Sequence, residues 1–169
     1  DPRIIPRNRK DRLMTNLLTH ALAYAGHREV KGTRSNPIIL DMIRDIFPTW
    51  GDDSTLAWCS CFINTCAVSM CYEDIMHLHH PGLARGWLNV GLAIERKDLK
   101  VGDLVIFDRG AGKGHVGFFL CDHGAAGIEV FGGNQGNAIT MSRYKMPLLG
   151  GRRLRPIEEV ETDYATITA

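Results

Sequence analysis

Apolar residues recur at helical spacing in the first half of the chain and at strand spacing in the second half. A first helix is predicted from residue 11 to about residue 25, with Asp11 as its cap, because a wide apolar face repeats there. A second helix is predicted to begin at Pro37, which suits a first helical turn, and to end before Pro48. A short helix is expected over residues 83–89.

A buried helix is predicted to begin near Cys59. Residues at offsets of three, four, seven and eleven from Cys59 are apolar and share one helical face: Phe62, Ile63, Cys66 and Met70. Asp52, Asp53 and Ser54 precede this helix, and such residues accept hydrogen bonds from the free amides of a first turn. We therefore expect Cys59 to lie at a capped helix N-terminus.

Short apolar runs separated by glycine-rich turns follow Val101, and they predict strands. The expected strands are residues 103–107, 116–121, 128–131, 138–142 and 148–154. Helices followed by strands are typical of an α+β fold, here with an antiparallel sheet that we expect to curl. We predict one catalytic domain over residues 1–169, with a core from about 11 to 155 and peripheral segments at 1–10 and 156–169.

Composition restricts the function classes. The 169 residues are 44% hydrophobic and 23% charged, as in ordinary soluble domains, and the net charge of +1 provides no basic field for nucleic acid. No apolar run is long enough to span a membrane. No signal peptide is visible, so the compartment is undetermined. We expect a monomer.

Cysteine and histidine spacing does not predict a metal site. Five cysteines are present without paired zinc-type spacing, so we expect at least one free thiol and no disulfide framework. His77 and His79 would point to opposite sides of a strand or helix, which separates them as ligands. We therefore expect no metal and no cofactor.

Cys59 is the candidate nucleophile. Unpaired N–H groups and the dipole at a helix N-terminus favour a thiolate, and the same amides can stabilise the oxyanion of a tetrahedral intermediate. The alternative is that Cys59 only packs in the core, because free cysteines are among the most buried residues.

His115 is the candidate base, since it opens an apolar strand beyond a glycine-rich loop and an imidazole titrates near neutral pH. A third group must fix the tautomer of such a base, and Asn134 is our prediction for it. Gln135 and Glu129 remain rivals, because Gly-Gly-Asn is also an ordinary turn sequence. Candidates for the lining of a substrate groove, if they do not simply complete the fold, are Trp50, Trp58, Asp53 and Gln135.

Several motifs in a fixed order resemble those of the CHAP-like and NlpC-like cysteine amidases and endopeptidases, the papain-like peptidoglycan hydrolases of bacteria and phages. They span roughly residues 20 to 153. The motifs are Glu29-Val30-Lys31-Gly32, Asn36-Pro37, Trp58-Cys59-Ser60-Cys61-Phe62, Ala84-Arg85-Gly86-Trp87-Leu88, Gly102-Asp103-Leu104-Val105-Ile106-Phe107, Gly114-His115-Val116-Gly117-Phe118 and Gly132-Gly133-Asn134-Gln135.

This resemblance implies a papain-like α+β fold and cleavage of an amide bond in bacterial peptidoglycan, by a peptidoglycan endopeptidase or an N-acetylmuramoyl-L-alanine amidase. It maps the nucleophile to Cys59, the base to His115 and the orienting residue to Asn134. One departure is Cys61, which stands where the resemblance leads us to expect a small residue, so a second thiol lies close to the first in the sequence.

Two other function classes stay open: a non-catalytic wall-binding domain on the same fold, and a cysteine-dependent acyltransferase. The biological setting is also open among a phage lysin, a wall remodeller and an effector delivered into a rival bacterium. The substrate in each case is the cell wall, reached in the periplasm or from outside. A delivered effector would have an immunity protein as its partner.

Overall fold

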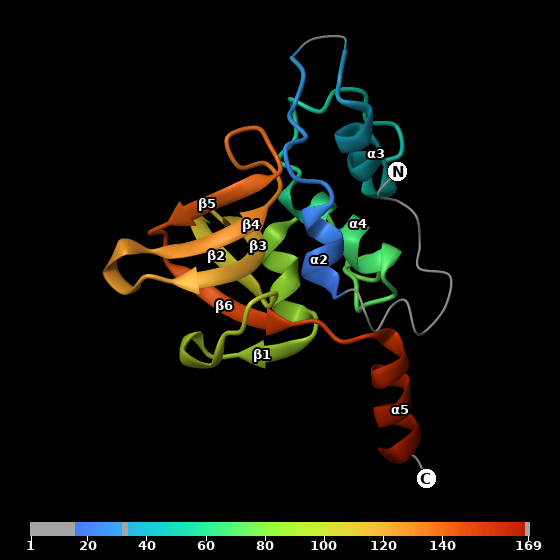
Figure 1. The fold of residues 1–169 in the computed structure, drawn as a ribbon. Helices are drawn as coiled ribbons and strands as arrows, with labels where there is room; N and C mark the ends of the chain where they lie inside the picture. Colours follow the sequence, from blue (N-terminus) through green and yellow to red (C-terminus); the bar gives the residue numbers. More distant parts are fainter. Residues whose placement is uncertain (1–15, 32–33, 168–169) are drawn as a thin grey trace.

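One layer of the fold is a six-stranded antiparallel sheet, and helices cover one of its faces (Figure 1). The computed structural model describes residues 16–31 and 34–167. The strands are β1 (Leu92–Ile94), β2 (Leu104–Gly110), β3 (Lys113–Asp122), β4 (Ile128–Gly132), β5 (Thr140–Tyr144) and β6 (Leu148–Arg153). Their order across the sheet is β1-β6-β2-β3-β4-β5. The antiparallel α+β prediction is confirmed, whereas the predicted curl is not: the sheet is open, with β1 and β5 at its edges.

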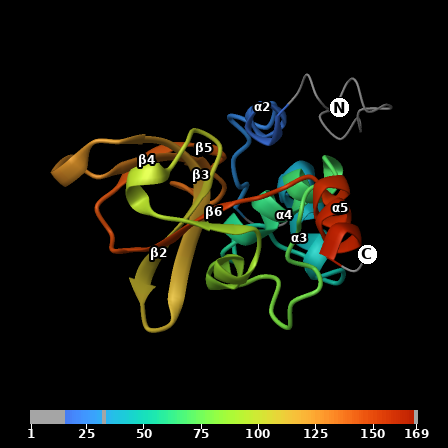
Figure 2. The same cartoon turned by 90° about the horizontal axis from the view of Figure 1, so that it is seen from below.

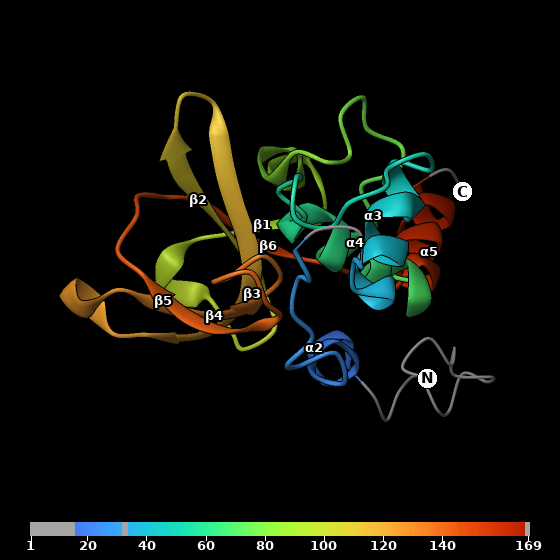
Figure 3. The same cartoon turned by 90° about the horizontal axis from the view of Figure 1, so that it is seen from above.

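The helices lie together on one side of the sheet (Figures 2 and 3). They are α2 (Leu17–Leu22), α3 (Pro37–Ile46), α4 (Cys59–Ser69) and α5 (Ile157–Ile167), with 3-10 turns at Ala84–Asn89, Arg96–Asp98 and Gly124–Ala126. Helix α4 packs between the sheet, through β3 and β4, and helix α3. None of the described helices has the length and apolar character needed to cross a lipid bilayer.

Helix α4 is central because it is buried on every side. Every residue from Cys59 to Ala67 is buried, including the polar Ser60, Asn64 and Thr65. The ring of Phe62 makes edge-to-face contacts with Tyr24, Phe118 and Phe131, at centroid distances of 6.1, 6.3 and 5.9 Å. These contacts fix the first turn of α4, and with it Cys59, against β3 and β4.

Both faces of the sheet are apolar. Alternate residues of β2 point to opposite sides, so Leu104 and Ile106 join the core under the helices. Val105 and Phe107 join a second cluster on the other face. His115 lies opposite Phe107 in the β2–β3 ladder, which places a histidine at the edge of that second cluster.

Three local predictions differ from the structure. Helix α2 begins at Leu17 with Asn16 as its N-cap, so the predicted start is too early; Asp11 itself lies outside the described residues. Strand β1 was not predicted, because three residues are too few to show alternation. The segment after Pro156 forms helix α5, which Arg155 ties to the core by ion pairs with Glu73 and Asp163.

Candidate active site

Cys59 is the first residue of α4, and it is 3% exposed. Trp58 is the N-cap and no side chain caps this helix end, which leaves amides of the first turn free. The backbone N–H groups of Cys59, Ser60 and Val116 lie close to the Cys59 sulfur. Since Val116 follows His115 in β3, the candidate nucleophile and the candidate base are neighbours in the fold.

The predicted capping by residues 52–54 is not seen. The Asp52 carboxylate accepts hydrogen bonds from the N–H and the hydroxyl of Ser54. The Asp53 carboxylate instead accepts from the N–H groups of Val30 and Asn36, at 3.3 and 2.7 Å. Neither carboxylate caps α4, so the helix amides stay available to the sulfur.

Burial sets the resting protonation of the thiols. It raises the pKa of Cys59, while the Val116 N–H, the charge of Arg109 and the amides of Ser60 and Cys59 act in the opposite direction. The Cys59 thiol is therefore protonated at rest at neutral pH. Burial, with a smaller contribution from Cys59, raises the pKa of Cys61 to about 12, and the Cys61 side chain is fully buried.

The imidazole of His115 is buried and held from one side only. Its Nε2 lies 2.9 Å from Oε1 of Gln135, whose own Nε2 donates to the Thr140 carbonyl. Because that second bond fixes the amide with Oε1 toward the ring, His115 Nε2 must carry the proton. Nδ1 is then an unprotonated acceptor, and it has no hydrogen-bond partner among the described residues.

The pKa of His115 is lowered to about 4, mainly by burial. The hydrogen bond that His115 donates to Gln135 raises that pKa and the positive charge of Arg109 lowers it, but both effects are smaller than desolvation. The imidazole is consequently neutral at neutral pH, as a general base must be before it accepts a proton.

Asn134 does not make the contact that we predicted for it; Gln135 makes that contact. Asn134 has a φ of 56°, a left-handed conformation that asparagine tolerates better than most residues. Asn134 therefore forms the turn, and the next residue points inward to His115. The rival Glu129 bonds to Arg143 and His123 instead. The sequence signal for Gln135 was its place directly after a turn-forming Gly-Gly-Asn.

Gly133, which precedes this turn, packs so closely against Trp58 that no side chain fits there. A Cβ at Gly133 would lie 2.5 Å from the Trp58 ring and 2.8 Å from Cβ of Phe62. The chain after β4 thus approaches the first turn of α4 more closely than any side chain allows. This approach brings Gln135 to the same end of the helix as Cys59.

Three of the four residues predicted to line a substrate groove are buried inside the protein. Trp58 is fully buried and its Nε1 donates to Glu29 Oε1 at 2.7 Å; Asp53 is also fully buried, and Gln135 is 2% exposed. Buried side chains cannot line an open groove, so the structure corrects this expectation for these three residues. Trp50 is half-buried against Phe47, and its Nε1 donates to the Asp52 carbonyl.

A backbone ladder clamps the loop that carries Gln135. Gly26 and Glu29 donate to the carbonyls of Ile139 and Asn137, and Ile139 donates back to His27. The Trp58–Glu29 hydrogen bond ties the same upstream segment to the first turn of α4. Segments far apart in the sequence therefore fix the three candidate residues.

Two residues near Cys59 and His115, which together are called the dyad below, were not predicted from the sequence to lie near them. The ring of Tyr144, in β5, lies 4.9 Å from the His115 ring and 5.6 Å from the Phe107 ring. The guanidinium of Arg109, near the end of β2, lies beside the Tyr144 hydroxyl. No spacing connects these residues to Cys59 or His115, because they come from separate strands of the sheet.

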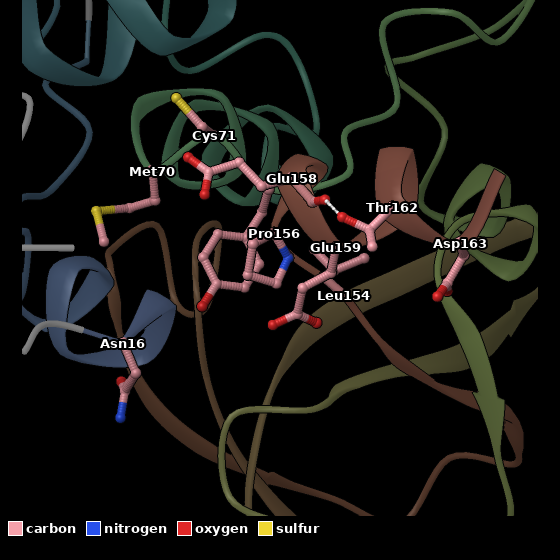
Figure 4. A pocket seen from close by; sticks show the side chains of 10 residues that line it. Asn16, Met70, Cys71, Leu154, Pro156, Glu158, Glu159, Thr162 and Asp163 are labelled. Carbon is pink, nitrogen blue, oxygen red and sulfur yellow. Dashed lines mark hydrogen bonds between the residues drawn. The ribbon is translucent and has the colours of Figure 1, made fainter. Parts of the chain in front are cut away.

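A pocket of about 710 Å³ lies elsewhere, between α5, the end of α4 and the start of α2 (Figure 4). Met70, Tyr72 and Leu154 line it together with the acidic residues Glu158, Glu159 and Asp163. Cys59, His115 and Gln135 do not line this pocket. Within residues 16–31 and 34–167, no cluster of three or more histidine, cysteine or acidic side chains is arranged to hold a metal ion.

Comparison with known proteins gives structural similarity only. No family model and no curated protein matches the sequence. Among solved structures, the chain is similar to an NlpC/P60 family protein from Bacillus cereus, with a TM-score of 0.49 and 18% identity over 90% of this chain and 42% of that one. It is also similar to a lipoprotein-like NLP/P60 family protein from Staphylococcus aureus, with a TM-score of 0.47 and 18% identity over 89% of this chain and 43% of the other. The chain spans less than half the length of either protein.

Proposed function

We propose that this chain is a cysteine hydrolase that cleaves an amide bond in the stem peptides of bacterial peptidoglycan. One observation carries the proposal: the His115 imidazole is neutral, hydrogen-bonded at Nε2 to Gln135 and unpaired at Nδ1, and the next residue, Val116, brings its N–H to the Cys59 sulfur at an uncapped helix N-terminus. A base with a fixed tautomer next to a nucleophile is the arrangement that nucleophilic catalysis requires. The peptidoglycan substrate rests on the resemblance of the ordered motifs.

In the first half of the reaction, Cys59 Sγ attacks the carbonyl carbon and His115 Nδ1 accepts the thiol proton. The negative charge on the carbonyl oxygen is stabilised by free N–H groups at the start of α4, with the Cys59 amide as the first donor. His115 then returns the proton to the leaving amine, the C–N bond breaks, and an acyl thioester remains on Cys59.

In the second half, His115 Nδ1 takes a proton from water as its oxygen attacks the acyl carbon. The C–S bond then breaks, the product carboxyl leaves, and the proton on His115 returns to Cys59 Sγ. Gln135 holds the ring throughout, and its Oε1 accepts from Nε2–H in both protonation states of the base. Burial favours a neutral thiol and a neutral imidazole at rest, so the proton moves during the attack and not before it.

Acyl transfer to an amine is the second candidate. The dyad and Gln135 are all at most 3% exposed, and a closed site disfavours water as the second substrate. The distinguishing observation is the product: hydrolysis releases a free carboxyl, whereas transfer yields a new amide when an acceptor amine is supplied.

The decisive experiment incubates intact peptidoglycan with wild type, Cys59→Ala and Cys61→Ala, followed by mass spectrometry of the soluble fragments. We expect wild type and Cys61→Ala to release fragments and Cys59→Ala to release none, and the new termini identify the bond. If wild type sediments with the wall and releases nothing, the protein is a wall-binding domain and the catalytic proposal fails.

The biological setting remains a prediction. A lysin, a wall remodeller and a delivered effector with an immunity partner would all use the same dyad. Cell lysis on expression in the periplasm, absent for Cys59→Ala, would support a lytic setting over a remodelling one.

A further inference from the structure

The rim of the candidate active site is formed by an aromatic side chain from the edge of the sheet. Tyr144 lies in the edge strand β5, and its ring packs on the His115 ring at 4.9 Å and the Phe107 ring at 5.6 Å. It is half-buried, so one part of the side chain covers the imidazole and another part reaches solvent. Tyr144, which carries a phenol hydroxyl, therefore lies at the boundary between His115 and water.

An arginine stands beside this hydroxyl. Arg109 follows Phe107 by two residues in β2, on the arm of the β2–β3 hairpin that projects from the sheet (Figure 3). Its guanidinium is adjacent to the Tyr144 hydroxyl, and its charge acts on both Cys59 and His115. Arg109 is exposed, so its charge is available to a molecule that approaches the dyad from solvent.

Arg109 has no carboxylate partner among the described residues, and the same holds for Arg152 of β6, whose Nε is buried without a hydrogen-bond partner. Arg109 differs from Arg152 because it is exposed and lies beside the candidate active site. The paired arginines are Arg85 with Asp108, Arg96 with Asp122, Arg143 with Glu129 and Arg153 with Asp103. The carboxylate next to Arg109 in sequence, Asp108, is already engaged by Arg85 and by the N–H of Gly110. The cation nearest the dyad is thus free to pair with an anion from outside.

We propose that Arg109 and Tyr144 form a carboxylate-binding subsite at the rim of the active site, and that the substrate is a peptide with a free carboxylate beside the scissile amide. A guanidinium presents its N–H donors in a planar fork that matches a carboxylate, and the phenol adds a donor at the same edge. This inference rests on the proposed hydrolase function, since the carboxylate is what places the amide carbonyl over Cys59.

The subsite makes a prediction about substrate choice that the dyad alone does not make. A hydrogen bond to a charged group contributes enough to change a rate constant roughly tenfold to a hundredfold. A stem peptide with free side-chain carboxylates is therefore cleaved with a kcat/KM about tenfold to a hundredfold above that of the same peptide with those groups as primary amides.

The experiment measures kcat/KM for the acid and amide forms of one synthetic stem peptide with wild type, Arg109→Gln and Lys113→Gln. Lys113→Gln is the matched control, because it removes one exposed positive charge from the same hairpin. We expect Arg109→Gln to lower kcat/KM for the acid form to the value for the amide form. The kcat/KM for the amide form should stay within about twofold of the wild-type value. Lys113→Gln keeps the preference.

Two results would overturn the subsite. One is a wild type that cleaves both forms equally; the other is an Arg109→Gln variant that slows both forms by the same factor, since Arg109 then acts only through the thiol. The rate of Cys59 alkylation by neutral iodoacetamide separates these cases: a loss confined to the acid form, whatever the alkylation rate, supports the subsite, whereas an alkylation rate that falls by the same factor as both forms shows that Arg109 acts through the thiol. If wild type cleaves neither the peptides nor intact peptidoglycan, the proposed function fails first and the subsite fails with it.

Discussion

Replacing Gln135 tests the core of the catalytic proposal, because this residue is the only described hydrogen-bond partner of the His115 ring. Gln135→Ala leaves the buried Nε2–H without an acceptor and removes one donor from the Thr140 carbonyl. A buried group left unpaired costs about 1–3 kcal/mol, so the variant should lose about 1–3 kcal/mol of its free energy of unfolding. Urea or thermal unfolding measures this loss.

The catalytic cost follows from the charge that His115 gains in the transition state. A hydrogen bond to an imidazolium is worth about 1.5–3 kcal/mol, so Gln135→Ala should lower kcat/KM by roughly tenfold to a hundredfold in the folded fraction. The acid limb of the profile of kcat/KM against pH also moves. Gln135 raises the pKa of His115, so its removal shifts the limb from about pH 4 to lower pH.

Gln135→Glu moves the same limb in the opposite direction, because a carboxylate beside the ring stabilises the imidazolium and raises its pKa. Asn134→Gly is the matched control, since glycine keeps the left-handed turn and only removes the side chain first predicted to orient the base. The reasoning is refuted if Asn134→Gly costs more activity than Gln135→Ala, or if neither Gln135 variant moves the acid limb.

Three further predictions concern stability. Gly133→Ala should cost about 1–3 kcal/mol in urea unfolding, because its Cβ would meet the Trp58 ring at 2.5 Å, whereas Gly51→Ala, with open space around it, should be neutral. Asp53→Asn should cost about 1–3 kcal/mol with KM unchanged, because its carboxylate accepts two backbone N–H groups; a raised KM at unchanged stability would return Asp53 to the substrate groove. The pKa of His115 is about 4 in the native state against an ordinary 6.5, so the unfolded state binds more protons between these values. Stability should therefore fall by up to about 3 kcal/mol as pH falls through that window, and His115→Gln should remove this part of the loss.

The features that the sequence predicted well depend on local patterns. Helix α4 and strands β2 to β6 have apolar periodicity and glycine turns within a few residues of each boundary. The positions of Cys59 and His115 follow from those elements, since one opens a helix and the other lies near the start of a strand. Pattern reasoning can place such residues because their surroundings are their own neighbours in the chain.

The features that could not be predicted from the sequence depend on side-chain direction and on long-range packing. Whether Asn134 or Gln135 faces His115 is decided by one left-handed residue after β4, which no periodicity records. Tyr144 and Arg109 reach the dyad only because β5 and β2 are placed around it by the order of the sheet. The capping prediction failed for the same reason: Asp53 found its donors in a segment more than fifteen residues away along the chain.

The ladder between the segment around Gly26 and the segment around Ile139 also bears on when the protein becomes active during its synthesis. A nascent chain that ends after β3 already contains Cys59, His115 and the segment around Gly26, but it lacks Gln135 and residues 137–139, with which that segment pairs. His115 in such a chain has no fixed tautomer. Partly made or partly folded molecules therefore contain Cys59 and His115 but should lack the proposed activity. Recovery of activity during refolding should accordingly follow the slowest closure of the chain and not the earlier formation of its helices.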